Sequence, residues 1–216
     1  MINILIPCSG DKFSNLSALI NSIDNQSVNT DVTCFFLEDQ ISNKFRLELE
    51  SICKKSKNKF LVENFYDKRL YGLFNVCRFL NDLSRSEESH DSIIAIIDCD
   101  DFLWGNDCLE NVLNEHNKGA DVVWTANELK GLGVNFSAPL NENINVYKHP
   151  WVCSHLKTFK LKRYISVDPK NFLDQKGDWF ESCYDQALML PILNNTIESG
   201  GKTKYIDKVH YIYNGN

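Results

Sequence analysis

The residues best suited to chemistry are acids that follow apolar segments of the chain. There are two such groups: Glu38 and Asp39 after residues 32–37, and Asp98, Asp100 and Asp101 after residues 93–97. Closely spaced carboxylates supply the hard oxygen ligands that Mg²⁺ and Mn²⁺ prefer, and such an ion can neutralise a diphosphate. The alternative is structural, an Asx turn with Asp101 or Asn106 capping the next helix. Because the second group follows a fully apolar segment, we favour the functional interpretation.

The elements that position these acids alternate between two hydrophobic periods. Short apolar runs, typical of buried strands, occur at residues 2–7, 32–37, 60–62, 92–97 and 121–125. Between them, apolar side chains recur at helical spacing at residues 16–23, 45–53, 70–80 and 109–116. This alternation predicts an α/β fold, a mostly parallel sheet flanked by helices. Ligands bind where the carboxyl ends of parallel strands meet, so we expect the acids to gather at that edge.

The alternation stops after residue 125. Residues 126–148 contain several glycines and asparagines without a sustained period, and we expect residues 129–148 to form a mobile flap. A short helix at residues 185–190 and a strand at residues 204–213 are predicted near the end of the sequence. No linker, repeat or low-complexity tract divides the sequence, so we predict one domain over residues 1–216.

Composition excludes several classes of protein. The 216 residues are 43% hydrophobic and 24% charged, which is typical of a globular chain and not of a disordered one. A net charge of −6 weighs against a broad nucleic-acid or anionic-membrane surface. The apolar run at residues 93–97 is far shorter than a transmembrane segment, and no signal peptide is apparent. Eight cysteines without a Cys-x-x-Cys pair predict reduced thiols in a cytoplasmic protein, either free or peripheral to a membrane.

Five motifs together resemble family-2 glycosyltransferases with the GT-A fold. In chain order they are Ile4-Leu5-Ile6-Pro7, Phe35-Phe36-Leu37-Glu38-Asp39, Gly72-Leu73-Phe74-Asn75, Asp98-Cys99-Asp100-Asp101 and Tyr184-Asp185-Gln186-Ala187-Leu188. They span nearly the whole chain, so the combination is far more specific than any single motif. One departure is Tyr184, which stands where the family more often has Glu.

The resemblance implies a role for each matching residue. Pro7 and the turn from Ser9 to Asp11 would line the nucleoside pocket, and Asp39, with Glu38 as the second choice, would bind the nucleobase. Gly72 and Asn75 would border the donor. Asp98 would contact the ribose or the metal shell, Asp100 would bind the Mn²⁺ or Mg²⁺ that bridges the diphosphate, and Asp185 would be the general base. The bland alternative for Asp185 is a first-turn acid of a helix.

Three further residues are candidates. His210 resembles the late His that some GT-A enzymes offer to the metal or diphosphate, although a His in a half-buried strand explains it slightly better. Trp151 and His155 begin a mixed aromatic and basic stretch, continuing to Lys157 and Arg163, that would hold phosphates or the acceptor. Packing beside a solvated face is the structural alternative for that stretch.

The implied function is an inverting, metal-dependent glycosyltransferase. Its donor would be a nucleotide-diphosphate sugar, foremost a UDP-sugar, bound by residues 1–125. Residues 126–216 would bind a hydroxyl acceptor, either a glycan or, in a phage, a modified DNA base. Two alternatives remain open: a non-catalytic nucleotide-sugar-binding module and a sugar nucleotidyltransferase. The latter needs a Gly-rich basic loop after the first strand, which the sequence lacks. A dinucleotide oxidoreductase is disfavoured because no Gly-x-Gly-x-x-Gly follows that strand.

Overall fold

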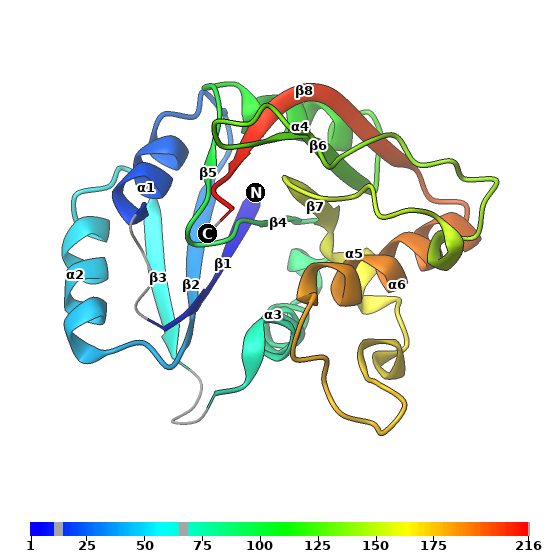
Figure 1. Ribbon diagram of the computed structural model, residues 1–216, viewed down its shortest axis with the longest axis horizontal. Coiled ribbons are helices and arrows are strands. Elements are labelled where there is room, and N and C mark those ends of the chain that lie inside the picture. Colours follow the sequence, from blue (N-terminus) through cyan, green and yellow to red (C-terminus); the bar gives the residue numbers. More distant parts are fainter. Residues whose placement is uncertain (11–14, 65–68, 216) are drawn as a thin grey trace.

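The computed structural model describes residues 1–10, 15–64 and 69–215, which form an α/β fold around one eight-stranded sheet (Figure 1). The strands are β1 (Ile2–Ser9), β2 (Val32–Asp39), β3 (Lys59–Asn64), β4 (Ile93–Ile96), β5 (Phe102–Leu103), β6 (Val122–Leu129), β7 (Lys157–Lys160) and β8 (Thr203–Tyr213). The helices are α1 (Leu16–Asp24), α2 (Asn43–Cys53), α3 (Tyr71–Leu83), α4 (Cys108–Asn117), α5 (Leu161–Ile165) and α6 (Tyr184–Glu198). Short 3₁₀ turns occur at Glu87–Ser89, Val146–Lys148 and Pro169–Phe172.

The sheet is mostly parallel, as the alternating pattern predicts. Its strand order is β3-β2-β1-β4-β7-β6-β8-β5. Strands β1 to β4 run parallel to one another, and β6 runs parallel to β8. Strand β7 is antiparallel to both of its neighbours, β4 and β6, and β5 is antiparallel to β8. The start of β7 therefore lies at the edge where β1, β2 and β4 end.

Two apolar clusters hold helices on the two faces of the sheet. Helices α1, α2 and α4 pack on one face, over side chains such as Ile4, Phe36 and Val123. Helices α3, α5 and α6 pack on the other, over Leu5, Trp124 and other apolar residues. In Figure 1, α1 and α2 lie on one side of the sheet, and α3, α5 and α6 lie on the other. The arrangement follows from parallel strands that are apolar on both faces and so need cover on both.

Two sequence predictions differ from the structure in extent. The helix expected at residues 185–190 is α6, which continues through Pro191 to Glu198 because Ile192, Leu193 and Thr196 are buried against the core. Strand β6 extends to Leu129, into the stretch expected to be irregular. Beyond it, the indole nitrogen of Trp124 donates a hydrogen bond of 2.9 Å to the carbonyl of Ala138, which ties that stretch to the sheet.

The eight cysteines are all free, and six of them are buried. Within the described parts of the chain, none of the helices combines the length and apolarity that crossing a membrane requires.

Candidate functional site

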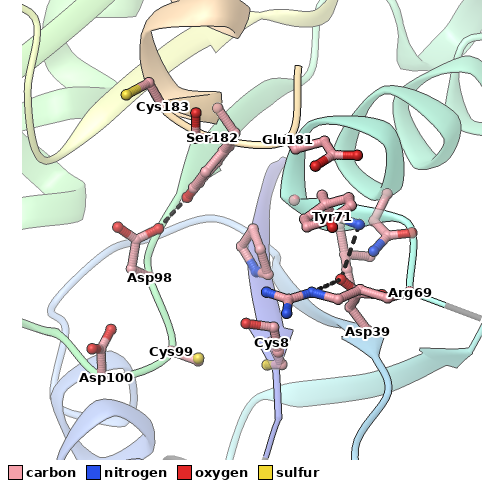
Figure 2. A pocket seen from close by; sticks show the side chains of 16 residues that line it. Cys8, Asp39, Arg69, Tyr71, Asp98, Cys99, Asp100, Glu181, Ser182 and Cys183 are labelled. Carbon is pink, nitrogen blue, oxygen red and sulfur yellow. Dashed lines mark hydrogen bonds and ion pairs between the residues drawn. The ribbon is translucent and has the colours of Figure 1, made fainter. Parts of the chain in front are cut away.

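A cavity of about 370 Å³ lies at the edge where β1, β2 and β4 end. The first turn of α3 and the segment that leads into α6 complete its walls. We call it the donor cavity, after the donor that the sequence analysis expects there. Figure 2 shows Asp98 and Asp100 on one side of this cavity and Asp39 and Arg69 on the other. The described residues that line it are Pro7, Cys8, Ser9, Leu37, Asp39, Arg69, Tyr71, Gly72, Asn75, Asp98, Cys99, Asp100, Glu181, Ser182, Cys183 and Tyr184.

Most residues expected at the nucleotide are therefore brought together. Pro7, Ser9, Asp39, Gly72, Asn75, Asp98 and Asp100 share this cavity. Asp11 lies outside the described residues. Arg69 is the only basic side chain among the described residues of the lining, and 55% of its side chain is exposed. It is accordingly available to an anionic group that enters.

Asp39 also has a structural task. Its two carboxylate oxygens accept hydrogen bonds of 2.9 Å from the backbone amides of Leu70 and Tyr71, at the start of α3. Helix N-termini have unpaired amides and a partial positive charge, so a buried carboxylate is well placed there. The Arg69 Nε atom lies 3.9 Å from the same carboxylate, and its guanidinium stacks over the Tyr71 ring at 4.8 Å. Asp39 thus orders the cavity wall whether or not it meets a nucleobase.

Glu38, the second choice for the nucleobase, does not reach the donor cavity. Side chains alternate between the faces of a strand, so Glu38 points to the face opposite Asp39. There it forms a two-pronged pair with Arg46 of α2, whose Nε atom lies 3.1 Å from Glu38 Oε1. Burial raises the pKa of Glu38, and the Arg46 guanidinium opposes that rise. The ion pair with Arg46 therefore accounts for Glu38 without a bound nucleobase.

Asp98 is held by a side chain from the far end of the sequence. The hydroxyl group of Tyr184, in the first turn of α6, donates to Asp98 Oδ1, and the buried environment raises the pKa of Tyr184. The Tyr184 ring packs on Gly72, where an added Cβ would lie 3.3 Å from ring atoms. The residue that departs from the family pattern therefore positions the carboxylate, and Gly72 makes room for its ring.

The other two acids of this group differ in environment. Asp100 borders the cavity, and burial, with a contribution from Asp98, raises its pKa. Asp101 is fully buried, and its oxygens accept from the Tyr211 hydroxyl at 2.7 Å and the Asn214 amide at 2.8 Å. Burial, reinforced by the charge of Asp98, raises the pKa of Asp101 to about 7. Asp101 therefore anchors the end of β8 and is not a helix cap.

The histidine that lies near the acids is His155, and not His210 as the sequence analysis expects. Among the described residues, the cluster that could hold a metal ion is Asp98, Asp101 and His155, whose ligand atoms lie within 4.8 Å of one another. His210 instead faces α4, where its Nε2 atom lies 3.0 Å from the amide nitrogen of Asn111, and it does not line the donor cavity. Its neighbour on β8, Tyr211, reaches Asp101 because adjacent strand residues point to opposite faces.

Asp185 lies in a second cavity of about 320 Å³, which we call the acceptor cavity after the role that the sequence analysis expects for Asp185. Its described lining residues are Phe136, Trp151, Ser154, His155, Asp185, Gln186 and Tyr213. Asp185 is adjacent in sequence to Tyr184, which lines the donor cavity, and His155 belongs to the cluster with Asp98. The two cavities therefore adjoin, and Trp151 and His155 border the second one and not the first.

Sequence reasoning missed several residues that line the donor cavity. Tyr71 and Cys183 have left-handed backbone conformations, with φ of 63° and 52°, which no sequence motif indicates.

Two basic residues of the stretch that begins at Trp151 lie outside the lining of both cavities. Lys157 was expected only as part of that stretch, yet it is fully buried beside His155. Arg163, from the same stretch, pairs with Asp121 at 2.7 Å, away from the lining of both cavities.

Comparison of the sequence with family models and with curated proteins finds no match. Solved structures of S. aureus TarS are similar in fold. TarS 1-349 in complex with UDP-GlcNAc aligns with a TM-score of 0.68 and 16% identity over 100% of this chain and 58% of that one. The complex with UDP gives a TM-score of 0.67 and 16% identity over 99% and 60% of the two chains. A longer TarS structure gives 0.63 and 16% over 99% and 36%. This chain thus spans between about a third and three fifths of those chains, and the GT-A-type fold is confirmed.

Proposed function

We propose that this protein is a glycosyltransferase that moves a sugar from a UDP-sugar to a hydroxyl group of an acceptor. The observation that carries the proposal is the pair of adjoining cavities, one lined by Asp39, Asp98 and Asp100 and the other by Asp185. The fold shared with TarS, solved in complex with UDP-GlcNAc and with UDP, supports a uridine diphosphate sugar as the donor.

The donor cavity has parts suited to a nucleoside diphosphate. Pro7 and Ser9 at the end of β1 would lie against the nucleoside, with Asp39 at the base. Arg69 supplies a positive charge for the diphosphate, and its stacking on Tyr71 restricts where that charge lies. Asn75, which is buried on α3, offers amide hydrogen bonds at the cavity wall.

The carboxylate oxygens at this cavity are of the type that divalent cations such as Mn²⁺ and Mg²⁺ prefer as ligands. Asp98 keeps one carboxylate oxygen beyond the one that Tyr184 uses, and Asp100 borders the same cavity. The carboxylates repel one another, since the charge of Asp98 contributes to the raised pKa values of Asp100 and Asp101. Asp98 and Asp100 would hold Mn²⁺ or Mg²⁺, whose charge would stabilise the departing diphosphate.

Asp185 is our candidate for the general base. Its carboxylate would accept the proton of the acceptor hydroxyl while the hydroxyl oxygen bonds to the anomeric carbon of the donor sugar. The bond from that carbon to the diphosphate breaks in the same step, and UDP leaves. Because Asp185 lies in a different cavity from the one proposed for the diphosphate, attack would come from the face opposite the leaving group and invert the anomeric centre. The acceptor would be a glycan or another hydroxyl compound.

The test is Asp185→Asn, compared with the exposed control Asp207→Asn on β8. Calorimetry should give the same affinity for UDP-GlcNAc in wild type and in both variants. Transfer or donor hydrolysis should fall by about 10² to 10⁴-fold in Asp185→Asn alone, the usual worth of a general base. Near-normal turnover of Asp185→Asn would refute the base assignment. A wild type that binds sugar nucleotides yet processes none would indicate a binding module.

A further inference from the structure

Lys157, the first residue of β7, is fully buried in an unusual setting. Among the described residues no carboxylate lies within 4 Å of its ammonium group, although a buried charge ordinarily requires a partner. Its Nζ atom lies 3.2 Å from His155 Nδ1 and 5.8 Å from the centre of the Tyr184 ring. Among the described residues, the polar partner of this ammonium group is therefore one ring nitrogen of His155.

That contact determines which nitrogen of His155 carries the proton. An ammonium group has donors and no acceptor, so Nδ1 must accept from Lys157 through its lone pair. Because its lone pair is used in this contact, Nδ1 carries no proton and the ring is neutral. Burial, followed by the charge of Lys157, also lowers the pKa of His155, which acts in the same direction. A neutral imidazole has one ring proton, which must then be on Nε2.

The rest of the ring is fixed by stacking. The His155 ring lies parallel to the rings of Tyr211 and Tyr213, with centroid distances of 4.6 and 5.3 Å and an angle of 11° in each case. No hydrogen bond of Nε2 occurs among the described residues, while His155 borders the acceptor cavity with Asp185. The imidazole of His155 and the carboxylate of Asp185 thus line the same cavity.

We infer that Lys157 is a positioning residue that fixes His155 as a hydrogen-bond donor, and that His155 Nε2–H binds an oxygen of a carbohydrate acceptor beside Asp185. The cavity suits a sugar because Phe136, Trp151 and Tyr213 offer aromatic surface while His155, Asp185 and Gln186 offer polar groups. This inference rests on the proposed function for its ligand, but the state of His155 does not depend on it.

A consequence separates this role from metal binding. With Nδ1 engaged by Lys157 and Nε2 protonated, His155 has no free lone pair for a cation, despite its proximity to Asp98 and Asp101. A divalent cation would therefore be held by carboxylates, and loss of the imidazole should leave Mn²⁺ affinity unchanged.

The first test is nitrogen-15 NMR of the histidine side chains in wild-type protein, with His155→Phe used to assign the His155 signals. We expect a neutral ring protonated at Nε2 from pH 6.5 to 8, and a mixture of tautomers in Lys157→Met. A ring protonated at Nδ1 in wild type would overturn the inference without affecting the proposed function.

The second test concerns the ligand. Saturation-transfer NMR in the presence of UDP would measure binding of methyl glycosides of glucose, galactose and N-acetylglucosamine. Phe keeps the stacking and removes the donor, so His155→Phe should weaken binding by about 10-fold, with UDP and Mn²⁺ affinities within twofold of wild type. His155→Gln, which keeps an N–H group, should recover part of the loss. Unchanged binding in His155→Phe, or no glycoside bound by wild type, would refute the carbohydrate role. Failure of wild type to bind UDP would instead contradict the proposed function.

Discussion

Replacing Asp39 by Asn tests whether the carboxylate that closes β2 is chiefly a structural cap. Both of its oxygens accept backbone hydrogen bonds of 2.9 Å, and only 5% of the residue is exposed. An Asn side chain has the same shape but one acceptor oxygen, so its NH₂ group would face one of the two amides. The loss of a charge-assisted bond costs about 1.5–3 kcal/mol, and a buried unpaired amide costs about 1–3 kcal/mol. The nearby Arg69 is exposed and adds little.

We therefore expect Asp39→Asn to lower the free energy of unfolding by about 3 kcal/mol or more, which corresponds to a fall in Tm of roughly 6–12 °C for a chain of this size. Urea unfolding followed by circular dichroism would measure it. The matched control is Asp168→Asn, because Asp168 is an exposed cap that accepts one amide hydrogen bond, from Lys170 at 3.0 Å. Asn is as good as Asp at such a position, so the control should change stability by only a few tenths of a kcal/mol.

A result in which both variants unfold like wild type would refute the reasoning, because it would mean that the amides of Leu70 and Tyr71 need no carboxylate. UDP affinity should fall with Asp39→Asn even at temperatures where the variant is folded, since the same amides position Tyr71 and Arg69 at the donor cavity. Loss of UDP affinity without loss of stability would instead favour direct contact with the nucleobase.

Four further predictions follow, three on the acids and their partners and one on the buried His116. Tyr184→Phe removes the hydroxyl bound to Asp98 and should cost about 1–3 kcal/mol of unfolding free energy, measured in urea; an unchanged midpoint would show that the bond contributes nothing. Mn²⁺ at 100 times its Kd should raise wild-type stability by about 2.7 kcal/mol, and Asp100→Ala should abolish the rise in Tm; a full rise in that variant would exclude Asp100 as a ligand. The last two predictions use chelator-treated protein. The pKa of Asp101 rises from 3.8 to about 7, so the stability it contributes below pH 3.8 is lost as pH rises through 7, and Asp101→Asn should gain on wild type between pH 5 and pH 8. Burial lowers the pKa of His116 from 6.5 to about 4, so its contribution has the opposite sign and is lost as pH falls from 6.5 to 4; His116→Gln should be less sensitive to acid than wild type. Unfolding midpoints across pH 4–8 that run parallel in all three proteins would contradict both assignments.

The sequence predicts the first half of the fold well because its signals there are local. Apolar runs alternate with helical spacing, and burial on both faces of a parallel sheet requires that pattern. The position of the acids at one edge follows from the strand direction, and Asp39, Asp98 and Asp100 do share a cavity. Those predictions need no information on side-chain packing.

The predictions that are wrong concern residues whose place depends on the direction of a single side chain. Glu38 and Asp39 are adjacent acids, yet one pairs with Arg46 on a helix and the other caps α3. His210 and Tyr211 differ in the same way, since only the tyrosine reaches the acidic cluster. A shift of one residue along a strand exchanges its faces, and no motif in one sequence specifies which face meets the ligand.

Strand β7 explains why the second half of the chain contributes to the same site. An all-parallel sheet would place the start of a strand at the edge opposite the acids. Because β7 is antiparallel to β4, with Ile96 paired to Lys157, its first residues lie beside the end of β4 where Asp98 follows. That reversal brings His155 and Lys157 within reach of Tyr184 and the acidic cluster. The antiparallel direction of β7 thus joins the cavity at the ends of β1, β2 and β4 to the cavity that contains Asp185.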